Sequence, residues 1–135
     1  MAHTPFPTRI LTPDGEVFNG EVEMVSTRTT VGLIGVMAKH APLLATLEPT
    51  ELRLHTGDGQ IARYAQSEGY LQVGGNQALL LVEEVTPVEK LDAEALRERL
   101  RVAEEELAAA GEDATRRAGA ARDKKRFELF LSLAK

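Results

Sequence analysis

The sequence contains no cysteine and no tryptophan among its 135 residues. Without cysteine there are no disulfides, no zinc ribbons or Fe–S clusters held by thiolates, and no thiol nucleophile. No stretch reaches the roughly 18 to 20 apolar residues that span a bilayer, and residues 1–15 lack the basic and apolar regions of a signal peptide. We therefore expect a soluble cytoplasmic protein that touches a membrane only through a partner.

The composition is that of a soluble globular protein, with 43% hydrophobic and 27% charged residues. A chain of this length forms one domain, or one compact domain with an appendage. The charge is divided unevenly: residues 1–86 and residues 87–114 each carry a net charge of −5, whereas residues 115–135 carry +5. This asymmetry separates a basic segment at the C-terminal end from an acidic remainder.

Residues 1–86 carry the pattern of short strands separated by tight turns. In residues 51–55 two leucines alternate with polar residues, which is typical of a strand buried on one face. Residues 57–59 then turn the chain into residues 60–64 as a hairpin, and the apolar run at residues 79–82 predicts a strand buried on both faces. Many short strands without a helix predict an antiparallel β-sandwich.

After Pro87 the apolar period changes from that of a strand to that of a helix. Asp92 predicts the N-cap of a first helix and Gly111 its end. Two apolar stripes follow, the first formed by Leu96, Leu100, Ala103 and Leu107, and the second by Phe127, Phe130, Leu131 and Ala134, with Ala114, Ala118 and Ala121 upstream of it. The fold class is therefore mainly β plus α, with a β-sandwich in residues 1–86 and an antiparallel two-helix hairpin in residues 87–135.

The predicted hairpin has few apolar anchors for its length. Burying one leucine contributes roughly 1.5–3 kcal/mol, whereas ordering each residue costs about 1–2 kcal/mol. Gly119 adds a cost of about 1 kcal/mol within the second helix. We expect a marginal hairpin that changes its docking between states.

No catalytic constellation emerges from the sequence. His40 has no nearby second histidine and no adjacent carboxylate to orient it, so a structural or interface role is favoured over that of a general base. His55 points outward from its strand and His3 lies at a terminus. The paired glycines open no helix and precede no Gly-Lys-Ser/Thr, so they predict turns rather than phosphate loops.

A basic group on the second helix is the remaining candidate for binding. Nucleic acid is one ligand for such a group, but aromatic residues make up only 4% of the chain and its pI is near 5.3, which disfavours that reading. An acidic protein surface is the more natural partner, and a solvated helix face remains an alternative. The group consists of Arg116, Arg117, Arg122, Lys124, Lys125 and Arg126.

One long motif resembles the core signature of the ATP synthase epsilon subunit. It reads Gly32-x-x-Gly35-Val36-x-x-x-His40-Ala41-Pro42-Leu43-Leu44, followed by Pro49 and Leu52-Arg53-Leu54. The resemblance extends upstream through Thr12-Pro13-Asp14-Gly15, and downstream through Gly69-x-Leu71-x-Val73 to Leu91-Asp92. It covers essentially the whole chain, in the same order.

The resemblance implies a rotor subunit of the F1 central stalk that is not catalytic alone and needs no cofactor or metal. The sandwich would bind the gamma subunit and sit on the c-subunit ring, at the cytoplasmic face of the cell membrane. The hairpin would reach the alpha and beta subunits and restrain ATP hydrolysis, its basic arm meeting an acidic segment of beta. The implied interface with gamma and the c ring comprises Leu33, Gly35, His40, Ala41 and Pro42.

The chain departs from the family pattern at two places. Leu33 and Ala38 stand where the family usually has an acidic residue and a proline. Leu91 and Asp92 match the start of a nucleotide-binding motif, but Ala95 and Leu96 replace its arginine and alanine, so we expect weak or absent ATP binding. A nucleotide-sensing module and a nucleic-acid adaptor using the basic arm are the alternative functions.

Overall fold

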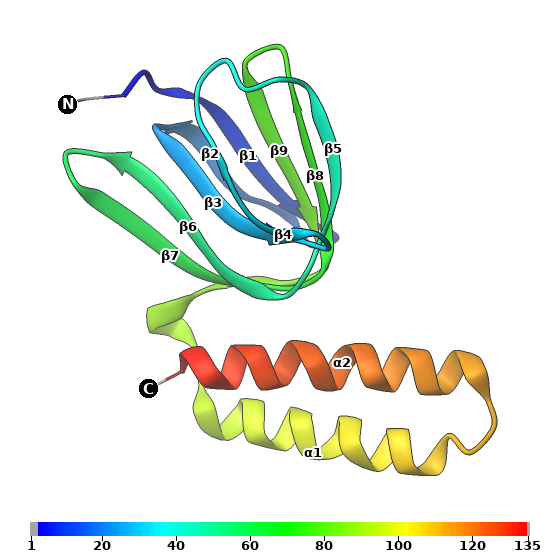
Figure 1. Ribbon diagram of the computed structural model, residues 1–135. Helices are drawn as coiled ribbons and strands as arrows, with labels where there is room; N and C mark the ends of the chain where they lie inside the picture. The colour runs from blue at the N-terminus through cyan, green and yellow to red at the C-terminus, as the bar shows by residue number, and fades with distance from the viewer. Residues whose placement is uncertain (1–2, 135) are drawn as a thin grey trace. The chain divides into compact units, whose positions relative to one another are not determined.

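A computed structural model describes residues 3–134 (Figure 1). The chain separates into two compact units, with the division between Pro87 and Val88. The first unit holds every strand and the second holds both α-helices.

Ten strands make up the described part of the first unit. Their order across the sheet is β10-β7-β6-β3-β5-β8-β9-β1-β2, with β4 paired to β3 beside this path. Neighbouring strands are antiparallel except β1 and β9, which are parallel. The strands are β1 (Phe6–Thr12), β2 (Gly15–Val22), β3 (Met24–Thr29), β4 (Gly32–Val36), β5 (Leu43–Leu47), β6 (Thr50–Gly57), β7 (Gln60–Gln66), β8 (Gly69–Gly74), β9 (Gln77–Val82) and β10 (Val85–Pro87).

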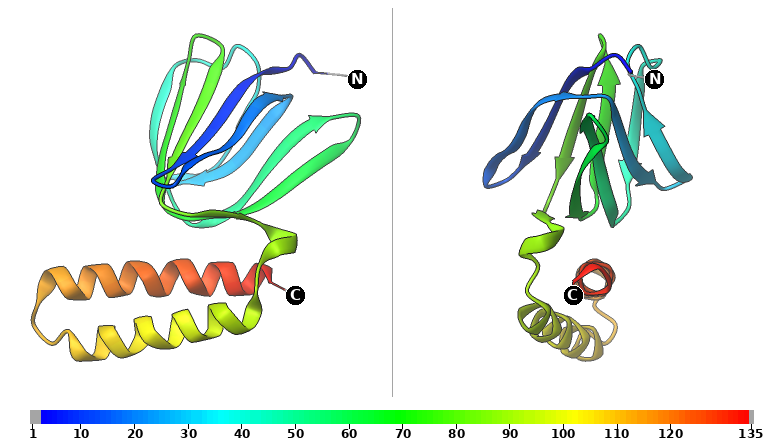
Figure 2. Two further views of the ribbon diagram at one scale, coloured as in Figure 1. Left: turned by 180° about the vertical axis from the view of Figure 1, so that it is seen from behind. Right: turned by 90° about the vertical axis from the view of Figure 1, so that its left-hand side faces the viewer.

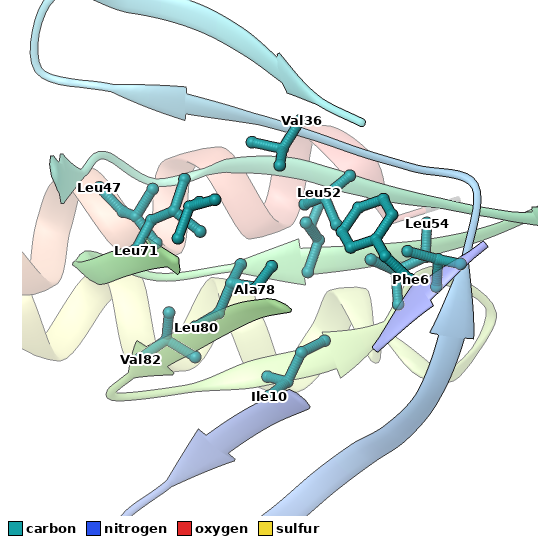
Figure 3. Close-up of a cluster of buried hydrophobic side chains, with 13 residues drawn as sticks. Phe6, Ile10, Val36, Leu47, Leu52, Leu54, Leu71, Ala78, Leu80 and Val82 are labelled. Carbon is teal, nitrogen blue, oxygen red and sulfur yellow. The ribbon is translucent and has the colours of Figure 1, made fainter. Parts of the chain in front are cut away.

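The alternation of side chains along the strands builds one apolar core. On β6, Leu52 and Leu54 are buried while Arg53 between them is exposed, as the period of two requires. Figure 3 shows these leucines with Phe6 from β1 among the other buried side chains of the cluster. The β-sandwich prediction is confirmed, as is the hairpin that joins β6 to β7.

Residues 79–82 were expected to be buried on both faces of their strand, and this expectation is wrong for one face. Leu80 and Val82 are buried in the core, but Leu81 is 42% exposed on the outer face of β9. On neighbouring β8, Tyr70 stands opposite Leu81 and is 57% exposed. The apolar run therefore supplies both the core and part of an uncovered outer face.

One buried glutamine, Gln66 at the end of β7, links β3 to the connection between β5 and β6. The Gln66 side chain accepts a hydrogen bond from Thr27 Oγ1 at 2.6 Å. Its amide donates to the carbonyls of Glu48 and Ser67, both at 3.1 Å. Because each polar atom of Gln66 has a partner, its complete burial carries no unpaired group.

The second unit is a two-helix hairpin, as predicted. A short 3₁₀ helix, η1 (Val88–Lys90), precedes α1 (Ala93–Ala109) and α2 (Ala114–Leu133). The two α-helices lie side by side and antiparallel in every view (Figure 2). No helix within residues 3–134 combines the length and apolar character that crossing a membrane requires.

The two ends of α1 lie where the sequence predicts them. The small residues that the sequence predicts on the apolar stripe of α2 do not lie on its buried face. Asp92 is the N-cap of α1, accepting a hydrogen bond from the Ala95 amide at 3.1 Å, and Gly111 follows the helix with φ +57°. Ala114, Ala118 and Ala121 are exposed, whereas Ala120 is buried. The reason is helical geometry, since Ala120 lies seven residues before buried Phe127 and so shares its face.

Candidate functional site

The loop between β4 and β5 is fixed by the neighbouring β8–β9 hairpin. The Lys39 amide donates to Asn76 Oδ1 at 2.7 Å. Both residues have left-handed backbone conformations, with φ +64° at Lys39 and +59° at Asn76. The hydrogen bond therefore joins two tight turns that lie 37 residues apart in the sequence.

His40 is oriented by its own loop. Its Nδ1 lies 2.7 Å from the carbonyl oxygen of Ala41, so this nitrogen must carry the proton if it donates there. The His40 amide donates to the Met37 carbonyl at 3.2 Å. Ala41 and Pro42, which follow, are exposed. This geometry suits a contact loop, and the interface role of these three residues stays a prediction.

The outer face of β4 presents an apolar strip. We call the set formed by Val31, Leu33, Gly35 and Met37 the β4 strip. Val31 is 96% exposed and Leu33 is 72% exposed. Leu33 stands opposite Arg28 on β3, and Gly35 stands opposite Ser26.

The predicted interface residues divide between the two ends of β4. Leu33 lies near the turn into β3, whereas His40, Ala41 and Pro42 lie beyond the other end of the strand. The four steps along the chain from Leu33 to Met37, just beyond the end of β4, span about 13 Å at 3.3 Å per residue. The β4 strip connects the two parts, so the five residues form an elongated surface rather than one pocket.

A shallow groove lies beside β1, β8 and β9, where the sequence pattern predicts no site. It has a volume of about 390 Å³ and is lined by Leu11, Thr12, Pro13, Gly69, Tyr70, Leu81, Val82 and Glu83. The exposed Tyr70 and Leu81 described above form part of its wall. The apolar run at residues 79–82 was the available signal, but a run of this kind does not show which face remains uncovered.

Glu51 joins two arginines on the outer face of β6 and β7. Its carboxylate pairs with Arg63 and with Arg53. The Glu51 side chain is only 15% exposed. Hydrogen bonding from Arg63, and then from Arg53, lowers the pKa of the Glu51 carboxyl, while burial opposes that shift.

Several of the predicted basic residues of α2 are engaged within the hairpin. Arg116 pairs with Glu106 of α1 at 2.6 Å, and Arg117 Nη1 donates to the Gly111 carbonyl at 3.2 Å. The guanidinium of Arg126 lies 5.9 Å from the centre of the Phe127 ring. Arg122, Lys125 and Arg126 also interact within the chain, and Lys124 is half-buried. The basic arm is thus partly neutralised within its own unit.

The two candidate nucleotide residues have structural roles. The Asp92 carboxylate accepts the capping hydrogen bond of α1, and the Leu91 amide donates to the Val88 carbonyl at 3.2 Å. Across residues 3–134, no group of three or more histidine, aspartate or glutamate side chains is placed to hold a metal ion.

Comparison with known proteins places the chain in a family. The model of the ATP synthase delta/epsilon chain β-sandwich domain matches residues 5–88. The ATP synthase epsilon chain of Dichelobacter nodosus is 35% identical over 95 residues, which cover 70% of this chain and 66% of the relative. That of Bacillus pumilus is 36% identical over 110 residues, covering 81% of this chain and 82% of the relative.

A solved structure supports the same fold. A chain of the mitochondrial ATP synthase of Euglena gracilis superposes with a TM-score of 0.76 at 22% identity, over 95% of this chain and 80% of that chain. This likeness extends beyond the residues that the family model matches, and includes the helical part. The protein therefore belongs to the ATP synthase delta/epsilon chain family, as a chain of the epsilon type.

Proposed function

We propose that this chain is the non-catalytic epsilon subunit of the central stalk of an F-type ATP synthase, at the cytoplasmic face of the cell membrane. Residues 1–86 bind the gamma subunit and rest on the c ring, and residues 87–135 regulate ATP hydrolysis. The observation that carries the proposal is the family match across the complete sandwich. As the c ring turns, the sandwich moves with gamma and links ion flow to ATP synthesis on F1.

The geometry of the predicted interface supports binding to partner subunits. Its loop is fixed by the hydrogen bond between Lys39 and Asn76, so little conformational freedom is lost on docking. Leu33 offers an exposed apolar side chain whose burial by a partner is favourable. A rigid loop beside exposed apolar area is suited to transmit torque between subunits.

The construction of the hairpin supports a regulatory role. Three of its buried side chains are alanines, Ala103, Ala110 and Ala120, which bury little area. The larger anchors are Leu96, Phe127 and Phe130, and the ion pair between Arg116 and Glu106 is about half exposed. Exposed pairs of this kind contribute at most about 1 kcal/mol, so contacts with other subunits can compete with those inside the hairpin.

The proposed partners of the hairpin are the alpha and beta subunits. The net charge of +5 in residues 115–135 favours an acidic segment of beta. Internal pairing of Arg116 lowers the charge available while the hairpin is closed. Opening would release this charge, which couples extension to binding.

Deletion of the hairpin tests this function. In the assembled enzyme, a chain ending at Pro87 should raise ATP hydrolysis and still copurify with gamma. The substitution Arg116→Ala in the full-length chain is a milder probe, because it removes the cross-helix pair with Glu106. Loss of gamma binding by the full-length chain would refute the stalk assignment, and unchanged hydrolysis after deletion would refute the regulatory role.

Nucleotide sensing by this chain is proposed to be weak or absent. The Asp92 carboxylate already caps α1, and Ala95 supplies no charged group at the position where related nucleotide motifs carry arginine. Leu96 stands where those motifs carry alanine. Calorimetric titration of the full chain with ATP should show no binding at micromolar concentrations. Micromolar affinity would contradict this and favour the nucleotide-sensing alternative.

A further inference from the structure

The two helices of the hairpin are held together differently at their two ends. At the turn, residues 110–113 join α1 to α2 through the chain itself (Figure 1), and the ion pair between Arg116 and Glu106 lies close to this turn in the sequence. At the opposite, open end of the hairpin the chain does not connect the helices. Side-chain contacts hold them there, so these contacts decide whether the two arms of the hairpin stay closed.

One contact crosses from Arg99 on α1 to the ring of Phe127 on α2. The guanidinium carbon of Arg99 lies 4.2 Å from the centre of this ring, inside the roughly 6 Å range in which an aromatic face attracts a cation. At 100° per residue, Arg99 lies about 60° from Leu96 and about 40° from Ala103 around α1. It therefore stands beside the buried stripe to which these two residues belong.

The ring of Phe127 is largely shielded from water, since this residue is only 7% exposed. The exposed pair of Arg116 and Glu106 is weakened by salt, whereas a contact with a shielded ring is screened less. Arg126 lies 5.9 Å from the centre of the same ring, but it precedes Phe127 on α2 and moves with it. The contact of Arg99, in contrast, must break when the arms separate.

The distance of this contact from the turn gives it control over opening. Arg99 lies 11 residues before Ala110, or about 17 Å along α1, at 1.5 Å per residue. Phe127 lies 14 residues after Asp113, or about 21 Å along α2. Two arms that swing about their turn separate more the farther one looks from it, so a contact at this distance is lost at a small opening angle.

We propose that Arg99 is the latch of the hairpin: its guanidinium, placed on the ring of Phe127, holds α1 and α2 closed, and loss of this contact lets the arms part. The latch is a property of the chain alone. Its regulatory consequence rests on the proposed function, because that function takes the open arms as the form that binds other subunits. A change at Arg99 then sets how often the hairpin is available for binding.

Distances between the arms of the full chain test the latch directly. Because the chain has no cysteine, Ala95→Cys on α1 and Ser132→Cys on α2 place two nitroxide labels at exposed positions of the open end. Pulsed electron paramagnetic resonance then measures the ratio of open to closed hairpins. Arg99 is itself exposed, so Arg99→Gln should raise this ratio by about two- to fivefold, the range of a cation–aromatic contact at an exposed site.

The matched control is Arg97→Gln, which removes the same charge from α1. Arg97 lies about 160° from Arg99 around the helix, so this change should leave the ratio unaltered. Arg99→Lys keeps a cation and should restore part of the closure. Phe127→Leu keeps an apolar side chain but removes the ring, so Arg99→Gln should have no further effect in that background. Equal ratios for Arg99→Gln and Arg97→Gln, additive effects of Arg99→Gln and Phe127→Leu, or one closed distance in every variant would each overturn the latch.

The same variants in the assembled enzyme separate the latch from the regulatory role. Since open arms are the form proposed to restrain hydrolysis, Arg99→Gln should lower ATP hydrolysis relative to Arg97→Gln. A larger open fraction with unchanged hydrolysis would refute the regulatory role and leave the latch standing. An unchanged open fraction in the isolated chain would refute the latch, whatever deletion of the hairpin does to hydrolysis.

Discussion

Substituting Gly69 by alanine should destabilise the sandwich strongly, for a reason that the register of β8 and β9 makes explicit. Gly69 stands opposite Val82. A Cβ at this position would overlap the carbonyl oxygen of Leu81 and lie 2.8 Å from Val82 Cα. Both are backbone atoms, so no side-chain rotation relieves the contact and the strands must separate.

Overpacking of this kind costs about 1–3 kcal/mol, and we expect about 3 kcal/mol here because the obstacle is backbone. With a urea dependence of about 1.5 kcal/mol per molar, the unfolding midpoint falls by about 2 M. The two tyrosines, Tyr64 and Tyr70, both lie in the sandwich and the chain has no tryptophan. Tyrosine fluorescence therefore reports on this unit alone.

The matched control is Gly35→Ala, since its added methyl group meets only Met24 Sδ at ordinary contact distance. There the change in stability should stay within about 1 kcal/mol, with a gain expected from the reduced freedom of the unfolded chain. The steric argument fails if the urea midpoints of the two variants agree within about 0.3 M.

Two further predictions concern polar groups of the sandwich. Gln66→Leu should cost about 2–4 kcal/mol, because it leaves Thr27 Oγ1 and the Glu48 and Ser67 carbonyls without their partner; a urea midpoint equal to that of the unmodified chain would contradict this. Glu51→Gln should cost about 1 kcal/mol at pH 7. The native pKa of Glu51 is lowered by Arg63 and Arg53, so this difference should exist above the unfolded pKa of about 4.3 and vanish as the pH falls through the native value. A difference that is equal at pH 7 and pH 2.5 would refute the assignment, and Glu16→Gln, in a more exposed pair, should change stability less.

The sequence by itself determined the local elements and the family. The alternation in residues 51–55 predicted β6, Asp92 predicted the cap of α1, and Gly111 predicted its end, because each signal depends only on neighbours in the chain. The motif from Gly32 to Leu44 identified the family for the same reason, as it needs only the order of residues.

Tertiary structure decided which surfaces are covered and which distant groups meet. Leu81 and Leu80 are equally apolar in sequence, yet only Leu80 is buried, because the layers of the sandwich meet on one face of β9. Ala120 rather than Ala118 is buried in the hairpin, since the register of α2 follows from Phe127. Lys39 meets Asn76 across 37 residues. These features depend on how strands are ordered in space, which no local pattern specifies.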